Sequence, residues 1–158
     1  MADVGIKVDD KQVIKALASL SFKQMNKAYR EGMKKSLDPI LKQTKSNLRA
    51  SGIKGVSKPY ISKKNGRKYP SMVQGVKTSV YVGDTEDSYG KVHIMREFRL
   101  KWFEKGTQLR KTSKGWNRGS IQGRWFFKSA VEQKGNEAIK TLDENIRNSI
   151  LKAWDNRK

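Results

Sequence analysis

Apolar residues recur with a helical period over much of this chain, and two long stretches of that period stand out. Between Phe22 and Arg49 an apolar residue returns every three or four positions, which predicts one long helix. The period keeps its phase across Pro39, so a kink is expected there rather than a helix end. A second stretch predicts a long C-terminal helix from Trp125 to Trp154, with a weak point at Lys134-Gly135.

A short strand and a short helix are predicted before the long N-terminal helix. Residues 4–8 alternate between apolar side chains and small or polar ones, which is typical of a strand. Asp9 or Asp10 then caps a helix, because a carboxylate there accepts free backbone N–H groups and complements the helix dipole. The apolar stripe of this helix, which is expected to be buried, consists of Val13, Ile14, Leu17 and Leu20.

The middle of the chain predicts an antiparallel pair of strands and a short helix. Alternation over residues 76–82 indicates a half-buried strand, and a turn at 84–90 leads to its partner at 92–94. A short helix is expected from Arg96 to Lys105, ended by Gly106. These patterns together predict an α+β fold.

The predicted architecture is a single domain over residues 1–158. A small, mostly antiparallel sheet packs against two long helices, the kinked N-terminal helix and the C-terminal helix. Two polar, basic segments, 53–70 and 108–124, are expected to project from this body as loops. Within the first, Lys64-Asn65-Gly66-Arg67 favours a hairpin, because Asn-Gly suits a tight turn.

Aromatic residues are concentrated between Phe98 and Ala130. This stretch holds three of the four tryptophans and four of the five phenylalanines. Because so much aromatic surface favours burial, both ends of the stretch are expected to be anchored in the core. The loop between Thr107 and Trp125 has fewer such residues and is interpreted as an arm that contacts another molecule.

Positive charge is confined largely to two acid-free stretches. The chain carries 35 basic and 15 acidic residues, a net charge of +20. Residues 39–83 contain ten basic residues and residues 105–131 contain seven, and neither stretch contains an acid. Concentrated basicity of this kind indicates a polyanionic partner or an acidic surface. The candidate contact residues in the two loops are Lys54, Lys58, Lys63, Lys64, Arg67, Lys68, Arg110, Lys111, Lys114, Trp116 and Arg118.

The sequence offers little for catalysis, and no enzyme, cofactor or metal site is expected. There is no cysteine and a single histidine, His93, which lies in a predicted strand without a nucleophile motif nearby. The glycine-rich stretch 114–123 lacks the spacing of a phosphate-binding loop. No apolar run is long enough to cross a bilayer, so a soluble protein without a membrane partner is expected.

Two groups of acidic residues are candidates for a chemical site. Asp84, Glu86 and Asp87 are interpreted as a solvated turn, since the calcium-loop pattern is missing. Glu97 and Glu104 are seven residues apart and match an acid pair, but ion pairing with nearby arginines is the favoured interpretation.

Sequence-independent binding of double-stranded DNA remains an alternative function. The basic loops contain aromatic side chains suited to stacking, at Tyr60, Tyr69 and Trp116. No helix-turn-helix, zinc-finger or RNA-recognition signature is present, so DNA would be bound by charge without base reading.

Three stretches resemble one viral family. They are VGIKVDDKQVIKALASL followed by KQTKSNLRASG, then HIMREFRLKWFEKGT, and finally GRWFFKSA. Their order resembles that of the minor tail-component or neck (tail-completion) proteins of long-tailed double-stranded-DNA bacteriophages, the group named after gene product ten of an HK coliphage. The likeness in layout covers nearly the whole chain.

This resemblance implies a structural, non-catalytic virion protein of a phage or prophage. It would lie at the head-to-tail junction or tail end, assemble as a ring, contact other junction or tail proteins, and be made in the bacterial host cytoplasm. The matching residues would form a tight turn and an aromatic anchor that fix both ends of the second loop. They are Glu104, Gly106, Thr107, Phe126, Phe127 and Ala130.

Overall fold

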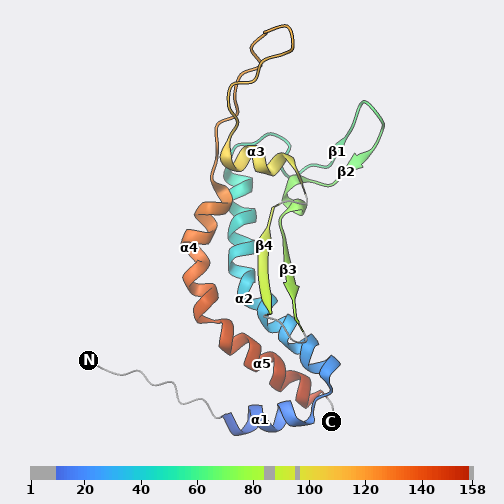
Figure 1. Cartoon of the computed structure of the whole chain (residues 1–158), viewed down its shortest axis with the longest axis vertical. Coiled ribbons are helices and arrows are strands. Elements are labelled where there is room, and N and C mark those ends of the chain that lie inside the picture. Colours follow the sequence, from blue (N-terminus) through green and yellow to red (C-terminus); the bar gives the residue numbers. More distant parts are fainter. Residues whose placement is uncertain (1–9, 84–87, 95–96, 157–158) are drawn as a thin grey trace, which may run out of the picture.

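The α+β prediction is confirmed by the computed structural model, which describes residues 10–83, 88–94 and 97–156 (Figure 1). The strand expected at 4–8 and the acids of the 84–87 turn lie outside the described residues. In chain order the elements are α1 (Asp10–Ser19), α2 (Phe22–Ala50), β1 (Tyr60–Ile61), β2 (Lys68–Tyr69), the 3₁₀ helix η1 (Met72–Gly75), β3 (Lys77–Tyr81), β4 (Tyr89–His93), α3 (Arg99–Lys105), α4 (Phe126–Lys140) and α5 (Leu142–Asp155).

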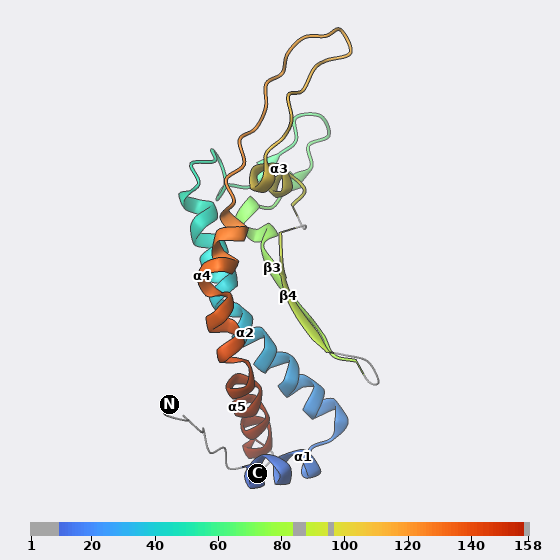
Figure 2. The same cartoon turned by 60° about the vertical axis from the view of Figure 1, so that its left-hand side comes forward.

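Helix α2 is the central element, and its continuity through Pro39 is confirmed. It begins with a capping box: the Ser21 hydroxyl accepts the N–H of Gln24, while the Gln24 side chain accepts the N–H of Ser21. Its 29 residues span about 43 Å. Figures 1 and 2 show α4 and α5 along one side of α2 and the β3–β4 hairpin along the other, and α2 contacts all four.

The prediction of one C-terminal helix is wrong, because the chain forms α4 and α5 with a break at Thr141. The Thr141 hydroxyl donates to the carbonyl of Glu137 at 3.0 Å, a local bond that competes with regular helix geometry. Beyond the break α5 packs closely on α2. A Cβ at Gly32 would lie 2.5 Å from the Cα of Ile146. The weak point expected at Lys134-Gly135 lies inside α4.

In the described residues the strands form two separate hairpins rather than one sheet. Strands β3 and β4 pair in antiparallel register from Lys77 opposite His93 to Tyr81 opposite Tyr89. The hairpin predicted at Asn65-Gly66 is confirmed by the pairing of β1 with β2 and by the positive φ of Gly66.

Two hydrophobic clusters lie at opposite ends of α2. The cluster near α3 consists of Leu48, Val56, Met72, Val73, Val76, Ile94, Leu100 and Phe126. The cluster near α1 consists of Ala16, Leu20, Ala28 and Ile150. The expected stripe of α1 is therefore only partly correct: Ile14 and Leu17 are exposed, and Ala16 joins Leu20 on the buried face.

Both ends of the aromatic stretch 98–130 are anchored in the core, as expected: Phe126 belongs to the cluster near α3, and Phe103 and Phe127 pack against that cluster. Phe126 is buried at 2% exposure, but Phe98 is 58% exposed, Trp125 48% and Trp116 72%. The rings of Phe98 and Trp102 contact each other edge to face, with their centroids 5.3 Å apart, on the outside of the molecule at α3. Three phenylalanines, Phe103, Phe126 and Phe127, thus anchor this stretch, and its three tryptophans are exposed.

Candidate functional site

Two basic segments extend from the end of the molecule that carries α3 (Figures 1 and 2), and the root of the one at 53–70 is held in the core by the buried Val56. We call residues 53–70 the first arm and residues 108–124 the second arm. All eleven candidate contact residues within them are exposed. In the part of the chain that the structure describes, the ion pairs are Glu97–Arg99, Lys128–Glu132 and Lys134–Glu137, and none uses an arm residue. The charge of the arms therefore faces solvent.

The first arm is stiffened at its hairpin. The N–H of Gly66 donates to the Ser62 carbonyl at 2.8 Å, and the N–H of Ser62 donates to the Arg67 carbonyl at 2.9 Å. The rings of Tyr60 and Tyr69 lie 6.1 Å apart. The arm thus presents its lysines from a paired backbone.

The second arm is a hydrogen-bonded ribbon, where the sequence indicated only a glycine-rich loop. The N–H of Arg110 donates to the Gly119 carbonyl, and the N–H of Arg118 donates back to the Arg110 carbonyl at 2.7 Å. The N–H of Thr112 donates to the carbonyl of Trp116, which lies at the tip. These backbone hydrogen bonds between the two sides of the ribbon hold the tip residues Lys111, Lys114 and Trp116 away from the body.

The residues expected to fix the ends of the second arm lie together at its base. The buried carboxylate of Glu104 accepts the N–H groups of Phe127 and Lys128, both at 2.9 Å. Those groups belong to the first turn of α4, so Glu104 caps a helix that starts far along the chain. Phe126 and Ala130 are buried behind it, and Phe127 is half-buried.

A double hydrogen bond and a close backbone crossing complete this base. The N–H of Thr107 donates to the Ile121 carbonyl at 2.8 Å, and the Thr107 hydroxyl accepts the N–H of Ile121 at 2.9 Å. Gly106 has φ +80°, and a Cβ there would lie 2.7 Å from the Ile121 oxygen and 2.8 Å from the Gly123 nitrogen. The two strands of the arm therefore cross at a point that only glycine fits.

Glu97 and Glu104 have separate structural roles. Glu97, with a side chain 3% exposed, binds the Arg99 guanidinium through both carboxylate oxygens, at 2.6 and 3.1 Å. The hydrogen bonds from Arg99 hold the pKa of the Glu97 carboxyl below its ordinary value, against the opposing effect of burial. The predicted ion pair with arginine is correct for Glu97, whereas Glu104 binds backbone N–H groups.

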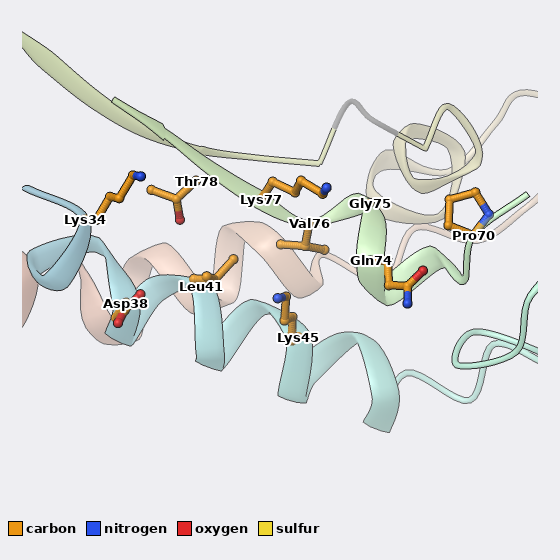
Figure 3. A pocket seen from close by; sticks show the side chains of 10 residues that line it. All are labelled: Lys34, Asp38, Leu41, Lys45, Pro70, Gln74, Gly75, Val76, Lys77 and Thr78. Atoms are coloured by element: carbon orange, nitrogen blue, oxygen red, sulfur yellow. The ribbon is translucent and has the colours of Figure 1, made fainter. Parts of the chain in front are cut away.

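His93 lies on the β3–β4 hairpin, and a groove lies between this hairpin and α2. His93 is half-buried on β4 opposite Lys77. No cluster of metal-binding side chains occurs among the described residues. A groove of about 680 Å³ between α2 and β3 is lined by Lys34, Lys45 and Lys77, with Asp38 at its side (Figure 3). It extends the basic surface from the base of the first arm along the body.

Sequence reasoning missed an apolar groove beside the second arm. This α3–α4 groove has a volume of about 710 Å³ and lies between the end of β4, helix α3 and helix α4. The high aromatic content of 98–130 signalled it, but that signal was interpreted as core. Its lining includes Val92, Ile94, Trp125, Phe127, Val131, Lys101, Lys105 and Lys128.

Comparison with protein-family models, with curated proteins and with solved structures found no match to this chain. None of the helices in the described part of the chain is both long and apolar enough to span a membrane.

Proposed function

We propose that this protein is a structural, non-catalytic component of a phage or prophage virion, at the head-to-tail junction or the tail end. It works there by protein–protein contact and assembles with further copies as a ring. The proposal follows the family resemblance of the sequence. It is supported most by one observation: two arms whose basic side chains take part in none of the ion pairs among the described residues extend from the same end of the molecule.

The exposed aromatic side chains at the base of the arms also favour an assembly role. Phe98 and Trp102 on α3, and Trp125 at the start of α4, are all exposed. Aromatic residues are enriched at protein interfaces, where they supply contact area at little entropic cost. A protein that works alone has little reason to expose three large aromatic side chains at one end.

The net charge predicts how assembly begins. Copies carrying +20 each repel one another at low salt unless a partner supplies negative charge. We therefore expect the purified protein to be mainly monomeric or weakly associated, and to form its ring on contact with acidic junction or tail proteins. Light scattering at low and moderate salt tests this, and a stable closed ring in dilute low-salt solution would contradict it.

Charge reversal tests the role of the arms. The arm variant carries Arg110→Glu, Lys111→Glu and Arg118→Glu, and the control variant carries Lys15→Glu, Lys23→Glu and Lys27→Glu at the far end. All six positions are exposed, and both variants remove six charges, from +20 to +14. We expect only the arm variant to lose co-sedimentation with portal or tail assemblies. Equal loss in both variants would show that net charge, not the arms, drives association.

Sequence-independent binding of double-stranded DNA is the second candidate. The lysines of the groove in Figure 3 favour it, because they continue the basic surface from the first arm onto the body. Filter binding of linear duplex DNA separates the two functions. Micromolar binding with a steep fall in affinity as salt rises favours DNA, and weak binding together with co-assembly favours the structural role.

A further inference from the structure

The α3–α4 groove combines an apolar floor with a positively charged rim. Val92, Ile94, Phe127 and Val131 supply apolar side chains from β4 and α4. Val131 on α4 is 39% exposed and stands at the edge of this groove. Such a surface is left open to solvent at a cost that a bound partner would remove.

The rim selects the charge of that partner. Lys101 and Lys105 on α3 are exposed and belong to none of the ion pairs of the described residues. Lys128 is paired with Glu132 at 3.8 Å, and the other carboxylate in the lining, Glu104, is committed to the cap of α4. The groove therefore favours an apolar segment flanked by acids.

Two other exposed apolar surfaces, on α1 and at the tip of the second arm, do not have this character. Ile14 and Leu17 on α1 lie beside Lys15, and Trp116 in the second arm lies between Lys114 and Arg118. Their cations would face Lys101 and Lys105. The sequence at 3–10 is different: Val4, Ile6 and Val8 alternate between Asp3 and the Asp9-Asp10 pair. An extended segment of this pattern presents three aliphatic side chains on one side.

We propose, on the basis of the assembly function given above, that residues 3–9 of one copy bind the α3–α4 groove of a second copy. The edge of β4 supports an extended occupant, because in the described part of the chain β4 pairs with β3 and with no other strand. An added strand on such an edge gains backbone hydrogen bonds, while its side chains enter the groove.

The segment cannot reach the groove of its own copy. Ala28 belongs to the hydrophobic cluster at α1, and Leu48 belongs to the cluster beside the groove. Twenty residues of α2 separate them, which is about 30 Å along the helix axis. Val8 can lie at most about 7 Å from the start of α1 at Asp10, and Val4 at most about 20 Å. Figure 1 shows α1 across the end of the molecule opposite α3. The contact is therefore between copies.

A disulfide cross-link between copies tests this contact, since the chain has no cysteine of its own. The test variant combines Ile6→Cys with Val131→Cys in the groove. The control combines Ile6→Cys with Ile139→Cys, on the same helix and 72% exposed but outside the groove. Both are oxidised in moderate salt, which screens repulsion between copies. We expect a ladder of disulfide-linked oligomers from the test variant and no more than dimers from the control.

A charge exchange provides a second readout. In this experiment one copy carries Ile6→Cys and the other carries Val131→Cys, so that a disulfide joins two different copies. Adding Lys101→Glu and Lys105→Glu to the second copy should lower the yield of this mixed dimer about tenfold. Asp3→Lys with Asp9→Lys in the first copy should restore it.

Three outcomes would overturn the contact: a purely intramolecular disulfide, a ladder from the Ile139→Cys control, or no restoration by the charge exchange. Failure of the contact leaves the arm-dependent co-sedimentation intact. If instead the proposed function is wrong, the protein will not co-sediment with portal or tail assemblies, whereas the cross-link between copies can still form.

Discussion

The carboxylate of Glu104 accepts a 2.9 Å hydrogen bond from the backbone N–H of Phe127, 23 residues further along the chain. The end of α3 is thereby fixed to the beginning of α4, and the whole second arm lies between these two points. One buried side chain closes the base of a projecting segment.

Replacing Glu104 by alanine should destabilise the protein by about 2 kcal/mol, because two N–H groups of α4 lose their acceptor. Glu104→Gln keeps an acceptor oxygen and should cost less. Urea denaturation of both variants measures the difference. Equal stability of Glu104→Ala and the original protein would show that water replaces the cap without cost.

Gly106 and Gly115 offer a matched test of the crossing at the base of the arm. Their φ angles are +80° and +81°, but a Cβ at Gly115 meets open space while one at Gly106 meets backbone atoms. Gly115→Ala should cost about 1 kcal/mol from strain alone. Gly106→Ala should cost at least about 2 kcal/mol more, as in other overpacked sites. Thermal unfolding of the two variants side by side gives the comparison, and equal losses would rule out the steric role of the crossing.

Gly32 and Gly135 should respond to alanine with opposite signs. Both lie inside helices, where alanine is favoured over glycine by about 1 kcal/mol. A Cβ at Gly135 would meet only a side-chain atom of Val131, at 3.9 Å, so Gly135→Ala should stabilise the protein. Gly32 faces the backbone of Ile146 at 2.5 Å, so Gly32→Ala should destabilise it by separating α2 from α5. The urea midpoints of the two variants show whether each substitution stabilises or destabilises the protein. Stabilisation by both substitutions would mean that α5 can move away from α2 freely.

The pair of Glu97 and Arg99 should make stability depend on acid pH. Because the folded-state pKa of Glu97 is held below its ordinary value of about 4.3, the pair stabilises the protein above that value. The stabilisation is lost as the pH falls through the folded-state pKa. Arg99→Ala should therefore cost about 2 kcal/mol at pH 7 and progressively less in acid, as Glu97 becomes protonated in the folded protein.

The control for that measurement is Lys128→Ala, which removes an exposed ion pair at 3.8 Å. It should change the free energy of unfolding by less than about 0.5 kcal/mol at pH 7 and in acid. A pH-independent loss in Arg99→Ala would assign the role of Arg99 to packing instead of charge.

The sequence was sufficient to predict elements whose signals are local. The phase of the apolar residues carried α2 through Pro39, and Asn65-Gly66 placed the tip of the first arm. The ion pair that was predicted between Glu97 and an arginine is also present.

Features that depend on distant partners were not predictable in this way. The C-terminal helix breaks at Thr141 and not at Gly135, although glycine is the poorer helix former. The break is favoured by the hydrogen bond from the Thr141 hydroxyl to a carbonyl and by the close approach of α5 to Gly32. The anchoring of both ends of 98–130 in the core was predictable, but hydrophobicity alone does not tell which individual aromatic side chains stay on the surface. Trp125 is 48% exposed.

The hydrogen bonds of Glu104 and Thr107 and the crossing at Gly106 all lie at the root of the second arm, and the ribbon beyond them is held by bonds within itself. Changes at the tip are therefore decoupled from folding. A lineage of such proteins can acquire a new binding partner by exchanging a few distal residues, and an engineer can graft a foreign epitope there without redesigning the scaffold.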